Sequence, residues 1–327
     1  MSLKILYAGS PEAAEKTLQI LFENQEKYDF EIAGVLTNPP TAKGRHKELI
    51  PTPVGIFARE KNLPVFEPEH LDAAARESVS PLKADLLVCF AYGHIFGPKF
   101  LALFPCGGIN LHPSDLPRYR GCTPVQTAIK NQDEQMAIAI QKLGLAMDEG
   151  DILKKEYRVI SEEDNGQSLL LESAQSGAKL ICEILKETSK NGKLPEGTPQ
   201  TGEPSYTGII TKEDGKINWN ESAAEIAAKV RAYFPDPSCW CVEKNLPLKI
   251  LNAKTVPEGS EIYNLLSKDY GDAKNGTVCV CHPKMGIHVK TGDGFLNVLE
   301  LQRQGKKPMN YKDFMNGARD FAGTILE

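Results

Sequence analysis

The sequence has no long apolar run and no strong net charge. No apolar stretch approaches the roughly 18 residues that a membrane-spanning helix needs. The strand-like run Lys4–Ala8 begins without the basic, apolar and small-residue parts of a signal peptide. The formal net charge of −5 over 327 residues argues against a generic nucleic-acid binder. We therefore expect a soluble protein of the cytoplasm with no membrane partner.

Cysteine spacing typical of zinc sites is also missing. Eight cysteines are present, but Cys239/Cys241 and Cys279/Cys281 are C-x-C pairs, and no pair of histidines completes a ligand set. Residues two apart share one face of a strand. We expect free thiols that are buried or half-buried, and no metal site.

The chain is long enough for two domains. Its 327 residues exceed the length of about 250–300 at which one core stops growing. Residues 207–327 carry 16 Lys and Arg against 15 Asp and Glu, whereas the rest carries 22 against 28. The C-terminal part is therefore mildly basic relative to the remainder.

Strands and helices alternate in the first half of the chain. Ser10 followed by Pro11 is typical of a helix N-cap and first turn. The pattern predicts strands at Lys4–Ala8, Glu31–Leu36, Pro64–Phe66, Ala84–Phe90 and Gly108–His112, and helices at Glu12–Glu23, Val54–Lys61, His70–Val79 and Ser168–Lys186. This alternation indicates an α/β domain over residues 1–189, with a Rossmann-like, mostly parallel sheet covered by helices.

The composition changes after this domain. Residues 190–206 are rich in Gly, Pro and Thr and nearly free of apolar residues, which predicts an interdomain linker. One helix is then expected at Ser222–Ala232. It is followed by short strand-like runs at Ser238–Val242, Leu248–Ala253, Thr277–Cys281, Gly286–Lys290 and Phe295–Gln302. Many short strands predict a small barrel or sandwich, and we expect a smaller, OB-like β-barrel domain over residues 207–327.

One group of polar residues fits a chemical site. Asn110 and His112 lie two apart at the end of a predicted strand, so their side chains share one face. Open α/β sheets bind ligands outside the carboxyl ends of their strands. Further on, Asp148 lies in a Gly-containing turn with Asp151. An amide, an imidazole and a carboxylate can divide oxyanion stabilisation and proton transfer in acylation of an amine.

Each of these residues has a simpler explanation when taken singly. A strand-end Asn or His is more often a partner in a structural hydrogen bond, and Asp148 and Asp151 are typical turn formers. The joint spacing of the residues favours chemistry over these explanations.

The longer motif around them resembles the folate-dependent formyltransferases. That family carries Asn-x-His-x-Ser-Leu-Leu-Pro, then a Gly, and later an Asp-x-Gly-Asp turn. The sequence has Asn110-Leu-His112-Pro-Ser114-Asp115-Leu116-Pro117, then Gly121, then Asp148-Glu-Gly-Asp151. It departs from the pattern at Asp115, where Leu is usual. The stretch Tyr7-Ala8-Gly9-Ser10-Pro11 also resembles the family's opening segment.

The resemblance implies a reaction and a co-substrate. A formyl group would pass from 10-formyltetrahydrofolate to an amine, without a metal. Asn110 would donate a hydrogen bond to the oxyanion, His112 would stabilise or orient it, and Asp148 would accept the amine proton. Folate contacts are implied for Ala91, Tyr92 and Gly93, and for Ser114, Asp115, Leu116 and Pro117.

The flanking segments resemble those members that act on initiator methionyl-tRNA. Residues 37–53 are similar to a basic insertion in these members, although Pro40 and Glu48 depart from it. The resemblance implies tRNA contacts through Lys43, Arg45 and Lys47, and through Lys306 and Lys307 of a tRNA-binding C-terminal domain. We expect a monomer.

Other functions stay open at this point. The acceptor could be an amino sugar nucleotide or glycinamide ribonucleotide. The formyl-folate could be hydrolysed without an acceptor. A third hypothesis is a non-enzymatic protein that binds tRNA or a nucleotide and uses Asn110 and His112 only structurally.

Overall fold

The computed structural model describes residues 2–43, 48–282, 284–318 and 320–327, and it divides into two compact units. The N-terminal unit comprises Met1–Pro124, Gln135–Val159 and Ser168–Gly208. The C-terminal unit comprises Val125–Glu134, Ile160–Gln167 and Ile209–Glu327. Two short segments from the first half of the chain thus pack with the second half. Each unit is described by itself.

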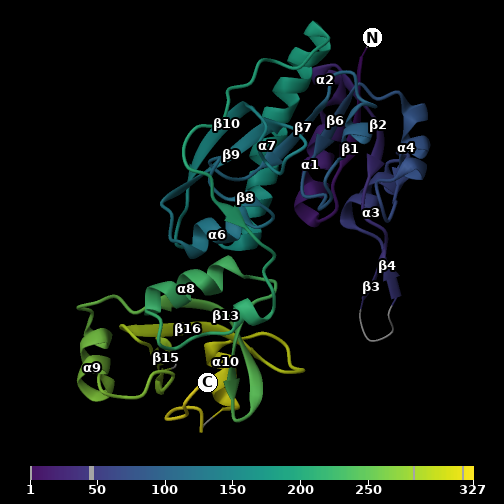
Figure 1. Cartoon of the computed structure of the whole chain (residues 1–327). Coiled ribbons are helices and arrows are strands. Elements are labelled where there is room, and N and C mark those ends of the chain that lie inside the picture. Colours follow the sequence, from purple (N-terminus) through teal and green to yellow (C-terminus); the bar gives the residue numbers. More distant parts are fainter. Residues whose placement is uncertain (1, 44–47, 283, 319) are drawn as a thin grey trace. The chain divides into compact units, whose positions relative to one another are not determined.

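One large sheet organises the N-terminal unit (Figure 1), in the order β10-β9-β7-β6-β1-β2-β5. Its strands are β1 (Leu3–Ala8), β2 (Phe30–Leu36), β5 (Val65–Phe66), β6 (Leu86–Cys89), β7 (Gly108–His112), β9 (Gln135–Lys142) and β10 (Ile152–Val159). Neighbours from β7 to β5 pair in parallel, whereas β9 is antiparallel to both β7 and β10. The predicted α/β fold with a mostly parallel sheet is confirmed.

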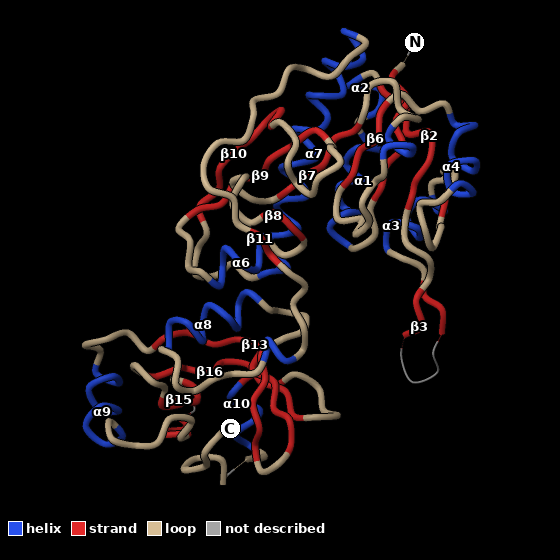
Figure 2. Tube along the Cα trace, in the orientation of Figure 1, coloured by secondary structure: helices blue, strands red, loops and turns tan. Residues whose placement is uncertain are grey.

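Two small strand pairs accompany this sheet. The hairpin β3 (Thr41–Lys43) and β4 (Glu48–Ile50) extends away from it, as Figure 1 shows. Strand β8 (Arg120–Gly121) pairs in parallel with β11 (Tyr206–Thr207), and the two lie side by side in Figure 2.

Helices cover both faces of the large sheet. The helices of this unit are α1 (Glu12–Glu23), α2 (Gln25–Tyr28), α3 (Pro53–Glu60), α4 (Ala73–Val79), α5 (Pro98–Leu101) and α7 (Gly166–Asn191), with a 3₁₀ turn at Ser80–Leu82. Helix α6 (Pro124–Lys130) belongs almost wholly to the C-terminal unit. Side chains of α1, α3 and α7 pack with Ile5 and Tyr7 of β1. Side chains of α4 and α5 pack with Leu6 and Ala8. The sheet is therefore buried on both faces, because alternate residues of a strand point to opposite sides.

Helix α1 begins and ends where the sequence predicts, but its N-terminus differs. The N-cap residue is Pro11, which provides no side-chain cap. The Ser10 hydroxyl instead accepts a hydrogen bond from the Asn38 backbone N–H at 3.1 Å and lies 3.3 Å from Oγ1 of Thr37. The predicted N-cap role of Ser10 is wrong, since this hydroxyl connects the chain after β1 with the chain after β2.

The C-terminal unit is built on an antiparallel sheet, in the order β12-β13-β16-β15-β14, with β17 paired to β16. The elements are a 3₁₀ turn (Glu213–Gly215), α8 (Ala223–Ala232), β12 (Cys239–Glu243), β13 (Leu246–Thr255), α9 (Glu261–Tyr270), β14 (Val278–His282), β15 (Gly286–Lys290), β16 (Phe295–Arg303), β17 (Met309–Asn310) and α10 (Tyr311–Asn316). The prediction of a smaller C-terminal domain built from many short strands is confirmed, and the structure shows that they form an antiparallel sheet.

The last residues of the chain connect the two outer strands of this sheet. Gly323 donates its backbone N–H to the Val278 carbonyl of β14 at 2.8 Å. Glu327 and Val242 of β12 exchange two backbone hydrogen bonds, at 2.7 and 3.0 Å. The tail thus satisfies backbone groups on both β14 and β12, which closes the sheet as expected for a small barrel.

Candidate active site

Asn110 and His112 project from one face of β7. Ile109 and Leu111 of the same strand pack into the core shared with α1 and α7, so the side chains of Asn110 and His112 point to the opposite face. In the strand ladder, Asn110 lies between Cys89 of β6 and Gln141 of β9. The sequence-based expectation that both polar side chains share a face agrees with this geometry.

Asp148 lies against both residues. Its Oδ1 is 3.4 Å from Nδ2 of Asn110, and its Oδ2 is 3.6 Å from Nδ1 of His112. Asp148 belongs to the turn between β9 and β10 and has φ = 54°. Asp adopts this left-handed backbone more readily than most residues other than Gly. The structure therefore brings the three residues predicted to be catalytic together at one point.

Two further donors hold the Asp148 carboxylate. The backbone N–H of Gly121 donates to Oδ2 at 2.8 Å, and Nε2 of Gln141 donates to Oδ1 at 2.7 Å. Gly121 has φ = 110°, and a Cβ there would lie 2.3 Å from the Thr207 carbonyl oxygen, so the position requires glycine. Gln141 was missed by the sequence analysis. Its buried amide finds its partner in Asp148, as buried polar groups must, but nothing in the local sequence signals that contact.

The two ring nitrogens of His112 face different groups. Nε2 lies 2.9 Å from the Tyr119 carbonyl oxygen, which can only accept, so Nε2 carries a proton and donates. Nδ1 faces the Asp148 carboxylate. The side chain is 4% exposed. His112 thus supports Asp148 from its buried side.

A second group of polar residues surrounds the Asp148 turn. Arg120 donates through Nη1 to Glu149 at 2.8 Å and to the Tyr206 hydroxyl at 3.1 Å. It also donates through Nη2 to Oε1 of Gln200 at 2.8 Å. Gln200 lies in the segment predicted to be a linker, and nothing in its local sequence connects it with Asp148.

The first segment predicted to bind folate follows β6. Ala91 and Gly93 have φ of 50° and 86°, and a Cβ on Gly93 would meet no atom within 4 Å. The Tyr92 ring is buried against Phe96, and its carbonyl accepts a hydrogen bond from Nδ2 of Asn38 at 3.1 Å. Burial raises the pKa of Tyr92 to about 12. The loop is therefore firmly held at Tyr92 and open at Gly93.

The second segment predicted to bind folate is mostly buried. The Ser114 hydroxyl donates to the Arg118 carbonyl at 2.7 Å, and the peptide between Leu116 and Pro117 is cis. Asp115 is the half-buried exception. It accepts hydrogen bonds from Nζ of Lys155 at 2.6 Å and from the Tyr157 hydroxyl at 3.2 Å, both on β10. Asp115, which stands where the family pattern has Leu, is therefore paired with Lys155 of the outer strand β10.

Comparison with known proteins identifies the family. A model described as formyl transferase matches residues 3–185, and a model of the formyl transferase C-terminal domain matches residues 209–319. The chain belongs to the formyl transferase family. It is 38% identical over 328 aligned residues to a methionyl-tRNA formyltransferase of Treponema denticola, with 98% of each chain covered. The predicted family and enzyme class are confirmed.

Solved structures of formyl transferases and related proteins share this fold. The methionyl-tRNA formyltransferase of Clostridium thermocellum has a TM-score of 0.57 at 16% identity, with 79% of this chain and 95% of that chain covered. HypX of Aquifex aeolicus in complex with tetrahydrofolic acid has a TM-score of 0.65 at 13% identity. The alignment covers 99% of this chain but 49% of HypX. At these identities the likeness supports the fold alone.

The residues predicted to bind tRNA lie in two segments. Lys43 ends β3, and Arg45 and Lys47 lie outside the described residues. Lys306 and Lys307 are exposed in the turn after β16, where the Lys306 N–H donates to the Arg303 carbonyl at 3.0 Å. These lysines therefore lie on a tight turn of the C-terminal unit.

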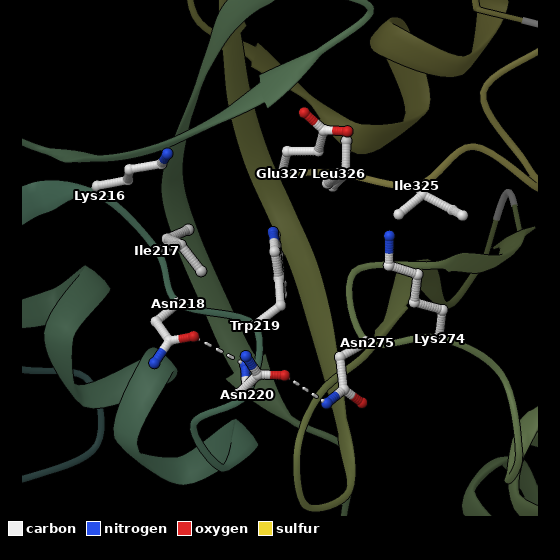
Figure 3. A pocket seen from close by; sticks show the side chains of 10 residues that line it. All are labelled: Lys216, Ile217, Asn218, Trp219, Asn220, Lys274, Asn275, Ile325, Leu326 and Glu327. Atoms are coloured by element: carbon white, nitrogen blue, oxygen red, sulfur yellow. Dashed lines mark hydrogen bonds between the residues drawn. The ribbon is translucent and has the colours of Figure 1, made fainter.

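A pocket of about 590 Å³ lies in the C-terminal unit of this formyl transferase (Figure 3). Trp219 lines it together with Lys216, Lys274 and the C-terminal residue Glu327. None of the residues predicted to be catalytic lines this pocket. We assign it no part in the formyl transfer chemistry.

The cysteines have no metal-binding arrangement. All eight are free, and the described residues contain no group of three or more His, Cys, Asp or Glu that could hold a metal ion. Burial raises the pKa of Cys89, Cys182 and Cys239 to about 12. In the part of the chain that the structure describes, no helix has the length and apolarity to cross a bilayer.

Proposed function

We propose that this formyl transferase moves the formyl group of 10-formyltetrahydrofolate to the α-amino group of initiator methionyl-tRNA. The products are N-formylmethionyl-tRNA and tetrahydrofolate. The observation that carries the proposal is the full-length similarity to curated methionyl-tRNA formyltransferases. The grouping of Asn110, His112 and Asp148 supports it with a chemically suitable site.

In the proposed reaction, the amine nitrogen attacks the formyl carbon and the bond from that carbon to folate N10 then breaks. Asn110 uses one amide hydrogen toward Asp148, and its second hydrogen is available for the developing oxyanion. Asp148 takes the proton that the amine loses and can return it to N10, so that the folate leaves as a neutral amine. Each group thus has one task that its chemistry allows.

His112 is proposed to act beside Asp148. Both ring nitrogens face acceptors, the Tyr119 carbonyl and the Asp148 carboxylate. A proton taken up by Asp148 can be shared with Nδ1 of His112, and a protonated ring would place positive charge near the oxyanion. The burial of His112 supports a task of stabilising and orienting over direct capture of the acceptor.

The folate is proposed to lie along the segment Ala91–Gly93. The open space at Gly93 leaves room for a flat ring beside the backbone. Ser114 and the residues from Asp115 to Pro117 are proposed to border the same site. Leu116 is 5% exposed, so it is proposed to support the residues that border the folate site and not to contact the folate over a large area.

The acceptor end of the tRNA is proposed to meet the hairpin β3–β4, and Lys306 and Lys307 are proposed to contact phosphates elsewhere on the tRNA. Such contacts position the nucleic acid without reading bases. We also propose that the protein acts as a monomer in the cytoplasm, with residues 1–189 as the catalytic domain and residues 207–327 as the tRNA-binding domain.

The deciding experiment uses the purified protein with 10-formyltetrahydrofolate and one acceptor at a time. The acceptors are methionyl-initiator tRNA, the same tRNA uncharged, and an amino sugar nucleotide, with a reaction lacking any acceptor. We expect formylmethionine on the charged tRNA and no tetrahydrofolate release without an acceptor. Formylation of the amino sugar nucleotide alone, or folate release without an acceptor, would overturn the proposal.

The tRNA contacts are tested by the salt dependence of binding. Each phosphate contact contributes about 0.7–0.9 to the slope of log affinity against log salt. Lys306→Ala with Lys307→Ala should therefore reduce the slope by roughly 1.5. The control is Lys99→Ala, an exposed lysine of α5. An unchanged slope in the double variant would remove these lysines from the interface.

A further inference from the structure

The segment after α7 is anchored on both sides of the Asp148 turn. Thr198 exchanges two backbone hydrogen bonds with Ile152, at 2.8 and 2.9 Å. The Ser205 carbonyl accepts from the Arg120 N–H at 2.9 Å, and β11 then pairs with β8 (Figure 2). The turn that carries Asp148 and the strand β8 that carries Gly121 are thus both bound to one stretch of chain.

Gln200 lies between these two anchors. Its Nε2 donates to the carbonyl of Asp148 at 2.8 Å and to that of Gly150 at 2.9 Å. Its Oε1 accepts from Nη2 of Arg120 at 2.8 Å and from Nε at 3.2 Å. Both ends of the amide are therefore used, which fixes its orientation. The first of these carbonyls belongs to Asp148, whose left-handed backbone (φ = 54°) is strained unless its surroundings hold it, and the second lies two residues further along the same turn.

Gln200 also orients the side chain that holds the carboxylate. Oε1 of Gln141 lies 3.4 Å from Nε2 of Gln200, and Nε2 of Gln141 donates to Asp148 at 2.7 Å. A rotated Gln141 amide would place its NH₂ group against that of Gln200 and its oxygen against the carboxylate. Gln200 therefore sets which way the Gln141 amide points.

We propose that Gln200 is a positioning residue for formyl transfer. It holds the backbone of the 148–150 turn and, through Gln141, the Asp148 carboxylate. The inference rests on the proposed task of Asp148 as proton acceptor. A misplaced catalytic group can lower turnover by about 100-fold, so Gln200 should act on kcat and leave the KM values for folate and tRNA largely unchanged.

The test compares steady-state formylation of methionyl-tRNA by the wild type, Gln200→Ala and Gln200→Glu. The carboxylate of the Gln200→Glu variant would keep an oxygen toward Arg120 but lose both N–H donors to the turn. We expect kcat to fall about 10–100-fold in both variants, with KM within about twofold. Glu203→Ala is the matched control, since Glu203 is an exposed residue of the same segment.

A purely structural task is separated by two further measurements. In an Asp148→Asn background, Gln200→Ala should lower kcat by no more than about twofold, because residues that act through one group are not additive. Thermal unfolding of each variant shows whether it is folded. If Gln200→Ala does not fold, kcat of Gln200→Glu is compared in the wild-type and Asp148→Asn backgrounds instead.

Several results would overturn the inference. Wild-type kcat in Gln200→Glu would show that the donors are not needed. If Gln200→Ala lowered kcat as much in the Asp148→Asn background as in the wild type, Gln200 would act independently of Asp148. A change confined to KM would show that Gln200 affects substrate binding. Failure of the wild-type protein to formylate methionyl-tRNA would instead refute the proposed function.

Discussion

Replacing Asp148 by Asn tests the centre of the site with little change in volume. Gly121 donates to one carboxylate oxygen and Gln141 to the other, at 2.8 and 2.7 Å. An Asn side chain has one oxygen and one NH₂ group, so one of these donors must face another donor. Rotation of the Gln141 amide does not help, because Nε2 of Gln200 lies on its other side.

The magnitude follows from two separate losses. An unsatisfied donor costs about 1–3 kcal/mol of folding stability, and the Asp148 side chain is 13% exposed, so water lowers the cost toward the smaller figure. Loss of a positioned proton acceptor lowers turnover by about 10²–10⁴-fold, equal to roughly 3–5 kcal/mol of barrier. The variant should therefore fold but be nearly inactive.

The assay is single-turnover formylation of methionyl-tRNA, with urea unfolding measured on the same preparation. Asp151→Asn is the control from the same turn, since its side chain is 43% exposed and forms a 3.6 Å ion pair with Lys142, away from Asp148. The control should keep its turnover and stability. If Asp148→Asn retained more than about a tenth of wild-type turnover, the assignment of Asp148 as proton acceptor would be refuted.

Three further outcomes are expected. Ser222→Ala removes the capping box at the start of α8, in which Ser222 Oγ accepts from the Glu225 N–H at 3.2 Å, and should cost about 1 kcal/mol in urea unfolding. Burial lowers the pKa of His288 to about 4 from 6.5, helped by nearby His282, so the unfolded chain binds an extra proton between these values. Stability should therefore fall as the pH drops through that window, and His288→Leu should flatten the change in melting temperature. Iodoacetamide at neutral pH should modify exposed Cys122 first, since burial raises the pKa of Cys279 and Cys281 to about 11. Cys122→Ser should remove the fast phase seen by mass spectrometry.

The sequence predicted elements well wherever the local pattern was strong. The bounds of α1, β7 and β15 agree with those expected. Strands β9 and β10 were not predicted, for different reasons. β9 mixes Gln, Met, Ala and Lys, which favour helices as readily as strands, and β10 is a largely exposed outer strand with several charged residues. Its pairing with β9 specifies it, and that information is not local.

The same distinction applies to the site. Asn110 and His112 were predicted because period-two spacing is visible in the chain, and Asp148 because its turn matched a motif. Gln141 and Gln200 were not found. Their amides meet the Asp148 turn through tertiary contacts between segments far apart in the sequence. The spacing of residues along the sequence cannot predict contacts of this kind.

The course of the chain after α7 matters for anyone who recombines members of this family. A chimera with its crossover at residue 189 would keep Asn110, His112 and Asp148 from this chain and take the residue at position 200 from the other parent. The side chain brought in at that position would then have to form hydrogen bonds with Arg120 and with the carbonyls of Asp148 and Gly150. Crossovers placed beyond Gly208, where the N-terminal unit ends, transfer the whole hydrogen-bonded assembly intact.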